Sequence, residues 1–304
     1  MNRVIILLIG LLVQAVASQA QSTQTSNSLN QSGESATKAI APARTNATES
    51  PFYIKLYGSY GLLTPGVQIR YSESLSQTGQ VFPFKTTNKG LGAGPRAGIG
   101  IGVIVSDFIN LGIDADILFG TAIKINNSYT DDLYSSSNTS STTLKLLSIT
   151  PNITFKALSR PAYYIYNRLG LVGGLVMEYK TVNNRIDLPT SGVGVNTTNV
   201  TTNSYTENSL ALGYQAALGV QFRLSQAIRG FVEVVAYNQS FKPKRLEVAS
   251  TDDVGGQITN KVVVTEFKDE GNIVNSTTAQ PNQSLSFNVS VNSVGIGAGL
   301  VVRF

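Results

Sequence analysis

The sequence ends on VGIGAGLVVRF, residues 294–304, and this stretch decides the fold. Successive side chains of a β-strand point to opposite faces. One face is then continuously apolar and consists of Val294, Ile296, Ala298, Leu300, Val302 and Phe304. The other face is small and carries one charge; it consists of Gly295, Gly297, Gly299, Val301 and Arg303. A core strand of a soluble protein can alternate in this way. A closing strand of a barrel in lipid accounts for the apolar face, the glycines and the terminal aromatic residue together.

Seven earlier segments alternate in the same way, with apolar residues on one face and glycine or polar residues on the other. They are residues 52–57, 96–105, 109–120, 147–156, 168–179, 210–223 and 228–237. With the terminal segment they make about eight strands of roughly 9–11 residues, the length that crosses a bilayer at a tilt. The sequence therefore predicts an all-β fold, an eight-stranded antiparallel up-and-down transmembrane β-barrel. Pro151 interrupts one segment, and we interpret it as a bulge or a strand end because proline cannot donate a ladder hydrogen bond.

The composition agrees with this interpretation. Charged residues make up only 13% of the 304 residues, against about 25% in a typical soluble protein. No apolar run reaches the ~18 residues that a transmembrane helix needs. A low charge content without long apolar runs is typical of strands that face lipid on one side only. A soluble secreted barrel remains as a weaker alternative.

The chain contains neither cysteine nor histidine. This excludes disulfides, thiolate metal sites and a cysteine nucleophile, and it removes the commonest general base and metal ligand. We therefore expect no enzymatic activity: no catalytic residue, no cofactor and no metal site. The formal net charge is +5, but the Lys and Arg residues are scattered rather than clustered among aromatic residues, so a nucleic-acid partner is not expected. The glycines of residues 98–102 are spaced by two, the strand period, and do not form a dinucleotide-binding motif.

The beginning of the chain has two distinct parts ahead of the predicted barrel. Residues 1–20 have the pattern of a signal peptide, with Arg3, an apolar run over residues 4–13 and small residues before a cleavage site after Ala20. A second site after Ala17 is also compatible, whereas a membrane anchor is not, because the apolar run is too short. Residues 21–50 are rich in Ser, Thr, Asn, Gln and Ala and predict a flexible leader without assigned function. Residues 51–304 form the predicted barrel domain.

Long and short connections alternate along the barrel domain. The long ones are the polar stretches 64–89, 126–141, 181–208 and 239–284, and the short ones are residues 106–108, 158–162 and 225–227. Outer-membrane barrels have short periplasmic turns and long extracellular loops. We therefore expect an exported protein of the outer membrane with both termini on the periplasmic side. Stretch 239–284 is long enough either to carry short strands or to fold over the barrel mouth, and the sequence does not decide between them.

The polar faces are predicted to point into the barrel, because Arg or Lys facing lipid at the midplane costs about 2–4 kcal/mol. Eight strands enclose a space that side chains just fill. We therefore predict a polar network that fills the lumen and consists of Arg96, Asp114, Asp116, Arg168, Glu178, Gln215, Gln221 and Glu233. Asp114 and Asp116 share a face, and we favour a structural pair balanced by arginine over a general acid/base pair.

Two sets of residues lie near the expected strand ends. Aromatic residues are expected to form two membrane-interface rims; they are Phe52, Tyr53, Phe108, Tyr163, Tyr164, Phe222 and Phe304 on the periplasmic side and Tyr60, Phe119, Tyr179 and Tyr237 on the outer side. Basic residues beyond the outer ends are candidates for contacts with lipopolysaccharide phosphates; they are Lys124, Lys180, Lys242, Lys244 and Arg245. Ordinary solvated loop charges account for these basic residues equally well.

Residues 90–120, GLGAGPRAGIGIGVIVSDFINLGIDADILFG, residues 168–174, RLGLVGG, and the terminal Phe304 carry a family resemblance. They resemble small porin-like outer-membrane β-barrel proteins, a family that includes the OmpA/OmpX-like and OmpW-like barrels. The resemblance implies an eight-stranded barrel inserted by the barrel-assembly machinery, with Phe304 as the C-terminal signal. Unlike OmpA, the sequence shows no periplasmic cell-wall-binding domain after the barrel, so peptidoglycan anchoring is not expected.

The expected function is that of a non-enzymatic outer-membrane protein with a structural, adhesive or surface-recognition role. Outer-membrane lipid and lipopolysaccharide are its expected partners, and the sequence names no extracellular ligand. The alternative is transport, through a narrow pore or an OmpW-like conduit for small apolar molecules.

Overall fold

The structure is a computed structural model that describes residues 51–63, 90–130, 132–160, 162–190, 194–269 and 281–304. The predicted signal peptide (1–20), the predicted leader (21–50) and the predicted connection 64–89 lie outside the described residues. Within the part that is described, there is no helix with the length and apolar character needed to cross a membrane.

The described residues form thirteen β-strands that belong to one sheet. They are β1 (Phe52–Leu63), β2 (Gly94–Ile104), β3 (Ile109–Phe119), β4 (Ile123–Thr130), β5 (Tyr134–Ser159), β6 (Tyr163–Pro189), β7 (Thr197–Asn208), β8 (Ala211–Arg223), β9 (Ile228–Phe241), β10 (Pro243–Val254), β11 (Gln257–Lys268), β12 (Asn282–Leu285) and β13 (Val289–Arg303).

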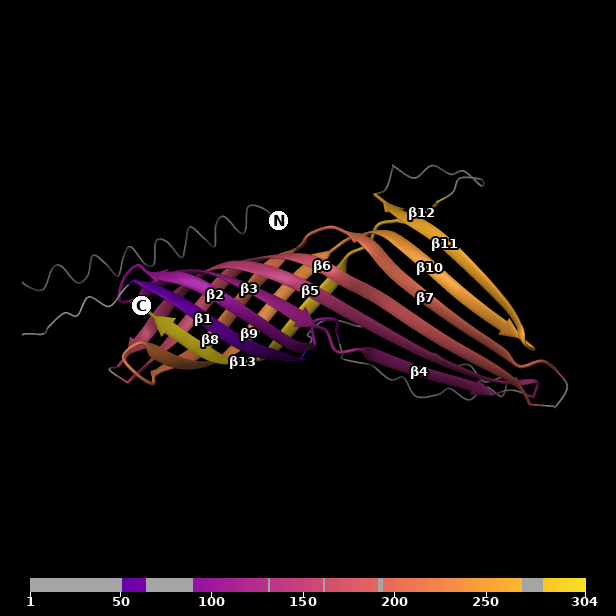
Figure 1. Cartoon of the computed structure of the whole chain (residues 1–304), viewed down its shortest axis with the longest axis horizontal. Helices are drawn as coiled ribbons and strands as arrows, with labels where there is room; N and C mark the ends of the chain where they lie inside the picture. The colour runs from indigo at the N-terminus through magenta and orange to yellow at the C-terminus, as the bar shows by residue number, and fades with distance from the viewer. Residues whose placement is uncertain (1–50, 64–89, 131, 161, 191–193, 270–280) are drawn as a thin grey trace, which may run out of the picture. The chain divides into compact units, whose positions relative to one another are not determined.

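Eight of these strands pair in a closed antiparallel ring, in the order β1-β2-β3-β5-β6-β8-β9-β13 (Figure 1). The pairing of β13 with β1 closes the ring, with Arg303 opposite Tyr53. Because each member has a partner on both sides, the ring has no free edge. The terminal stretch of the sequence thus lies inside β13, between β9 and β1.

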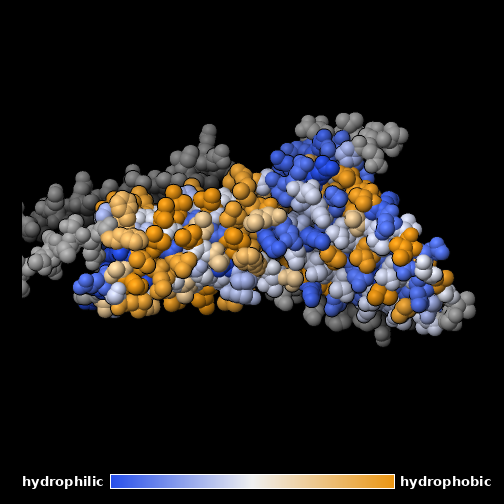
Figure 2. All heavy atoms as spheres, in the orientation of Figure 1, coloured by the Kyte–Doolittle hydropathy of each residue, from blue (hydrophilic) through white to orange (hydrophobic). Residues whose placement is uncertain are grey.

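Alternation along the ring strands separates an apolar outer face from a mostly polar inner face. On β5, for example, Ile149 is 50% exposed on the outside, whereas its neighbour Thr150 is fully buried inside. Figure 2 shows the apolar residues gathered over the wall of the ring. A shift by one residue would exchange the two faces of a strand, so this alternation fixes the register.

The sheet continues beyond one end of the ring as an extension, formed by β4, β7, β10, β11, β12 and the adjoining halves of β5 and β6 (Figure 1). The predicted count of about eight strands is therefore too low for the whole sheet. Stretches 126–141 and 181–208 are predicted as polar connections, but their described residues contribute instead to β4, β5, β6 and β7. Stretch 239–284, for which short strands are one of the two predicted possibilities, carries β10, β11 and β12. The Thr, Val and Tyr residues of these stretches favour strands, but polar residues stand on both faces, so the period-two apolar signal is absent.

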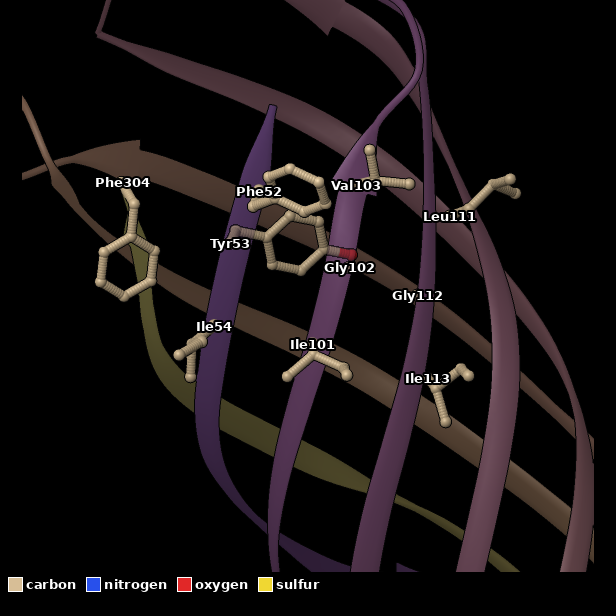
Figure 3. A pocket seen from close by; sticks show the side chains of 10 residues that line it. All are labelled: Phe52, Tyr53, Ile54, Ile101, Gly102, Val103, Leu111, Gly112, Ile113 and Phe304. Carbon is tan, nitrogen blue, oxygen red and sulfur yellow. The ribbon is translucent and has the colours of Figure 1, made fainter. Parts of the chain in front are cut away.

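Glycines on the inner face of the ring lie opposite aromatic residues of the next strand. The directly paired residues are Tyr53 with Gly102, Tyr57 with Gly98, Tyr166 with Gly219 and Phe231 with Gly299. Figure 3 shows the Tyr53 ring extending to Gly102. A Cβ atom on Gly219 would lie 2.6 Å from the Tyr166 hydroxyl oxygen. The rings therefore cover these glycines, and any larger residue would displace them.

Pro151 is neither a strand end nor a register shift, because β5 runs through it without interruption. Pairing with β3 includes Pro151, whereas pairing with β6 passes from Ile149 directly to Asn152. The Asn152 side-chain amide donates a 3.1 Å hydrogen bond to the Thr150 carbonyl. A side chain thus replaces part of the ladder that the proline interrupts.

Candidate functional site in the ring interior and at its rim

A buried group of ion pairs lies across the middle of the ring interior. Arg168 on β6 donates to Asp114 on β3 and, at 2.5 Å, to Glu233 on β9. Lys55 on β1 reaches the same Asp114 at 2.5 Å. All four side chains are less than 10% exposed. Buried charges of this kind are tolerated only when they are paired and hydrogen-bonded.

A second ion pair joins Arg96 on β2 to Asp116 on β3, at 2.8 Å. The hydroxyls of Tyr57 and Tyr237 donate to Asp116 at 3.3 and 3.4 Å. The Arg96 guanidinium lies 3.9 Å from the centroid of the Tyr237 ring, a cation–π contact. In the two groups together, three cations face three carboxylates, so these buried charges balance.

Tyrosine and amide groups fill the interior toward the short connections. Tyr166 donates a 2.7 Å hydrogen bond to Glu233, and Tyr164 donates to Gln221. The Lys156 ammonium lies 5.4 Å from the centroid of the Tyr164 ring. Tyr164, Tyr166, Gln221 and Glu233 line a cavity of about 30 Å³ in this part of the interior.

Seven of the eight residues predicted for the interior network are buried inside the ring: Arg96, Asp114, Asp116, Arg168, Gln215, Gln221 and Glu233. The eighth, Glu178, lies apart from them and forms a 2.6 Å ion pair with Lys145, with both side chains more than a third exposed. A register shift next to Lys145 places Glu178 opposite it, while Leu146 pairs with Val176. Because this bulge changes the alternation, Tyr179 rather than Glu178 packs inward.

The interior network contains three further residues that the sequence prediction does not include. They are Lys55, Tyr57 and Tyr166. The sequence does indicate an inward position for Lys55 and Tyr57, because they alternate with the apolar residues of the first segment.

Four tyrosines predicted for the membrane rims face the interior instead. Tyr164 and Tyr237 are 3% and 4% exposed, and Tyr53 and Tyr179 pack against buried clusters.

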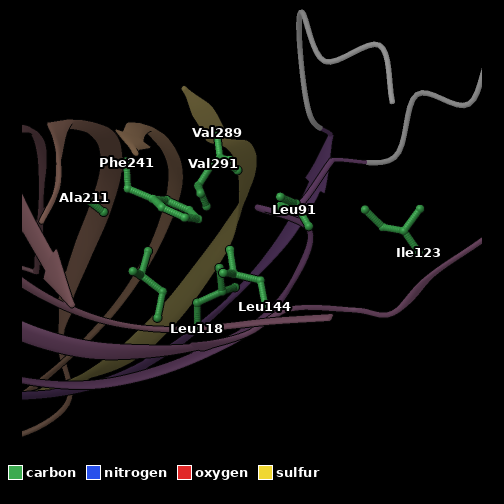
Figure 4. Close-up of a cluster of buried hydrophobic side chains, with 9 residues drawn as sticks. Leu91, Leu118, Ile123, Leu144, Ala211, Phe241, Val289 and Val291 are labelled. Atoms are coloured by element: carbon green, nitrogen blue, oxygen red, sulfur yellow. The ribbon is translucent and has the colours of Figure 1, made fainter. Parts of the chain in front are cut away.

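An apolar cluster occupies the interior where the ring meets the extension. It comprises Leu91, Leu118, Ile123, Leu144, Leu146, Ala211, Phe241, Val289 and Val291. Figure 4 shows Phe241 and Val291 directed toward Leu118 and Leu144. Tyr179 packs against the cluster and begins an aromatic row that continues with Tyr205 at 4.2 Å between ring centroids. The interior is thus polar in the ring and apolar at this mouth.

Three of the five predicted basic contact residues gather at one place on the rim. Lys242, Lys244 and Arg245 line an open pocket of about 370 Å³ between the ends of β7, β10 and β11, together with Lys268. Lys242 pairs with Asp269 at 3.2 Å, and Arg245 lies 3.6 Å from Glu207.

Hydrogen bonds from Ser286 and Lys242 lower the pKa of the Asp269 carboxyl, so it stays ionised beside the lysine. The other two predicted basic residues, Lys124 on β4 and Lys180 on β6, do not line this pocket. Among the described residues, no group of three or more acidic side chains is placed to hold a metal ion.

No family model matches the chain, and no curated protein matches it in sequence. Among solved structures it resembles the outer membrane protein OprG from Pseudomonas aeruginosa, at 11% identity and a TM-score of 0.39, over 84% of this chain and 97% of that one. It also resembles the outer membrane protein AlkL, at 9% identity and a TM-score of 0.31, over 91% and 96% of the two chains.

A third similar structure is the toluene transporter TbuX from Ralstonia pickettii, at 8% identity and a TM-score of 0.26, over 83% and 89%. All three likenesses are too low to establish a common fold or function.

Proposed function

We propose that the chain is a non-enzymatic β-barrel protein of the bacterial outer membrane, whose extension presents a recognition or adhesion surface outside the cell. The observation that carries this proposal is the ring itself. Its outer face is apolar, and its interior holds balanced, paired charges. A soluble barrel would place its apolar side chains inside instead.

The outer wall exposes many large aliphatic side chains, as is unusual for a protein surrounded by water. Leu171 is 72% exposed, Leu212 62% and Leu218 63%. Soluble monomers rarely expose contiguous apolar patches larger than a few hundred Å². Hydrocarbon as the surrounding solvent removes the cost of exposing these side chains. A closed ring can lie in hydrocarbon because its backbone groups are hydrogen-bonded between strands.

The arrangement of the connections supports one orientation. The connections 105–108, 160–162 and 224–227 are short and lie at the end of the ring where β1 begins and β13 ends. The extension lies at the other end. Because outer-membrane barrels have short periplasmic turns, we propose that the extension lies outside the cell. Phe304 then lies on the periplasmic side, where the barrel-assembly machinery would recognise it.

A filled interior supports a surface role over a water-filled pore. The central charges neutralise each other within hydrogen-bond distance, and the cavity beside them is about 30 Å³. The extension offers two sheet faces with Ser, Thr and Asn side chains, which are suited to hydrogen-bonded contacts with a partner.

Fractionation tests the membrane assignment. The folded protein is expected in the outer-membrane fraction, extractable only with detergent, with a gel mobility that changes on boiling. Recovery of folded protein in the soluble periplasmic fraction would contradict the assignment. Protease treatment of intact cells then tests the orientation. Cleavage is expected within β10–β11, whereas cleavage confined to the short connections would show that the extension lies on the periplasmic side.

Transport of small apolar molecules is the second candidate, and the apolar cluster at the mouth of the interior favours it. The two functions differ in a measurement on protein reconstituted into liposomes. The surface role predicts no stable conductance in planar bilayers and no solute uptake above that of empty liposomes. Uptake of an apolar solute that Phe241→Ala changes would favour transport.

Lipopolysaccharide is the proposed lipid partner at the rim, where Lys242, Lys244 and Arg245 line the open pocket. Lys242 and Arg245 each pair with one carboxylate but keep 47% and 42% of their side chains exposed, so they can add charge-assisted contacts with its phosphates. Replacing these three residues with Gln is expected to reduce the lipopolysaccharide that co-purifies with the barrel. Lys261→Gln, on the exposed part of β11, is the control and is expected to leave it unchanged. Equal retention by the triple variant and the control would contradict this partner.

A further inference from the structure

Basic residues gather on the inner face of the ring at its short-connection end, away from the extension (Figure 1). They are Arg223 on β8, Arg229 on β9 and Arg303 on β13. Each stands two residues along its strand from a buried inner-face residue; these are Gln221, Phe231 and Val301. Because side chains alternate along a strand, the three arginines belong to the same inner face. Lys156 on β5 is buried inside the same end of the ring.

The three arginines are neighbours across adjacent strands. Arg223 and Arg229 are directly paired across β8 and β9. Arg229 is paired with Val301, two residues before Arg303, so Arg303 is its diagonal neighbour on β13. Directly opposed like charges are destabilising, and diagonal neighbours, about 7–8 Å apart, remain within reach of long side chains. This end of the ring therefore carries an electrostatic cost that a bound anion would remove.

Tyr164 on β6 brings Lys156 and the arginines to one place. The Lys156 ammonium lies 5.4 Å and the Arg229 guanidinium 5.7 Å from the centroid of this one ring. Tyr164 is 3% exposed and donates to Gln221, so its ring is held in position. Arg223 donates from Nε to the Ser225 carbonyl at 3.2 Å and has an exposed side chain, so its terminal nitrogens can reach a ligand. Cations from four strands thus meet at the opening.

Positive charge is in excess at this opening. The described residues of 51–53, 104–109, 156–163, 222–229 and 303–304 contain one acidic side chain, Asp107, and the terminal carboxylate of Phe304 is a second anion. The same residues contain five cations, because Arg160 joins the four already named. Farther inside the ring, three cations face three carboxylates. The excess charge of the interior therefore belongs to the opening.

We propose that this opening is a phosphate-binding site formed by Arg223, Arg229, Arg303 and Lys156. A guanidinium binds phosphate through two parallel N–H···O bonds. Guanidinium groups that arrive from three neighbouring strands suit a tetrahedral anion, whose oxygens point in several directions, better than a planar carboxylate. The phosphate can belong to a phospholipid head group, which requires the proposed membrane orientation, or to free phosphate, which does not.

Calorimetric titration of the folded protein in a non-ionic detergent tests the site. The probes are inorganic phosphate and dihexanoylphosphatidylglycerol, with chloride keeping the ionic strength constant because salt screens exposed charges. The site variant is Arg223→Gln with Arg229→Gln, and Arg223→Gln alone is a milder variant at an exposed strand end. The control is Arg185→Gln with Lys261→Gln, which removes the same charge from the extension. A heat-dependent gel shift shows that each variant is folded.

Saturable binding is expected for the wild type and the control. The dissociation constant should rise at least about tenfold in the double site variant, because each lost charge-assisted hydrogen bond is worth about that factor, and it should rise less in Arg223→Gln. Tighter binding of phosphatidylglycerol than of inorganic phosphate would assign the site to a lipid head group, and equal or weaker binding would assign it to free phosphate.

Two results would overturn the site. One is the absence of saturable binding of either probe to the wild type, and the other is an affinity that the site variants and the control change equally. Because the titration is carried out in detergent, such a failure concerns the site alone, and fractionation tests the membrane assignment separately.

Discussion

At the scale of single residues, the interior depends on charges that neutralise each other across strands. Arg168 is central because it binds Asp114 and Glu233 from two different strands. Alternation in the sequence was sufficient to predict that Arg168 and its two partners face inward. It could not predict which of them meet, since that depends on the stagger between strands far apart in the sequence. The prediction from alternation is also wrong for Glu178, because a bulge in β6 exchanges the inner and outer faces there.

Arg168→Ala is predicted to destabilise the barrel by about 3–5 kcal/mol, because it leaves the buried Glu233 without its cation and Asp114 with Lys55 alone. The free energy of unfolding can be measured by urea titration in lipid vesicles, with tyrosine fluorescence or the heat-dependent gel shift as the signal. The control is Arg185→Ala, which removes an exposed 2.9 Å ion pair with Asp187 and should cost about 0–1 kcal/mol. Equal losses in the two variants would show that the interior pairs are not the stabilising element.

Gly219→Ala is predicted to destabilise the barrel by about 1–3 kcal/mol, the usual cost of overpacking. The added methyl would lie 2.6–2.8 Å from the Tyr166 ring end and the Glu233 Cβ. Gly173→Ala is the matched control, because nothing lies within 4 Å of the position its methyl would occupy, and its effect should be within about 0.5 kcal/mol. A larger loss for Gly173→Ala, in the same titration, would contradict the role given to the aromatic–glycine pairs.

At the scale of elements, the sequence pattern predicts the ring strands much more strongly than the extension strands. β13 alternates apolar residues with glycine, and its membership of a barrel followed from that pattern. β7, with the sequence TTNVTTNSYTEN, has no apolar face, because polar residues occupy both sides of the strand. Its strand conformation follows from pairing with β6 and β10, which no local pattern reveals.

Among the described strands, β10 and β11 pair only with each other and with β7 and β12 of the extension, so shortening this hairpin is expected to leave the barrel intact. Deleting residues 249–254 and 257–262 joins the directly paired Val248 and Val263 through Gly255 and Gly256. Both glycines have positive φ, 60° and 87°, as a two-residue hairpin turn requires. The variant is expected to insert into membranes with a normal heat-dependent gel shift.

Failure of this hairpin deletion to insert would mean that the extension is needed to form the ring. Deletion of residues 232–237 from β9 serves as the opposite control. It removes pairs with both β8 and β13 and is expected to abolish insertion.

At the scale of the whole molecule, the proposed function divides the sheet between two solvents, hydrocarbon around the ring and water around the extension. Around the ring the exposed side chains are aliphatic and aromatic, whereas over the extension polar residues predominate (Figure 2). The sequence predicted the first region well, because an apolar outer face and a polar inner face impose a period of two. It predicted most of the second region as connections, because polar residues on both faces leave no such period.

The most direct measurement compares arginine at two positions with the same exposure but different proposed solvents. Leu218 on the ring and Val262 on the extension are each 63% exposed. If the ring lies in lipid, Leu218→Arg should lower the yield of folded, heat-modifiable barrel in vesicles and cost about 2–4 kcal/mol, while Val262→Arg should fold as the wild type does. Equal folding of both variants in vesicles would contradict the membrane-spanning ring on which the account rests.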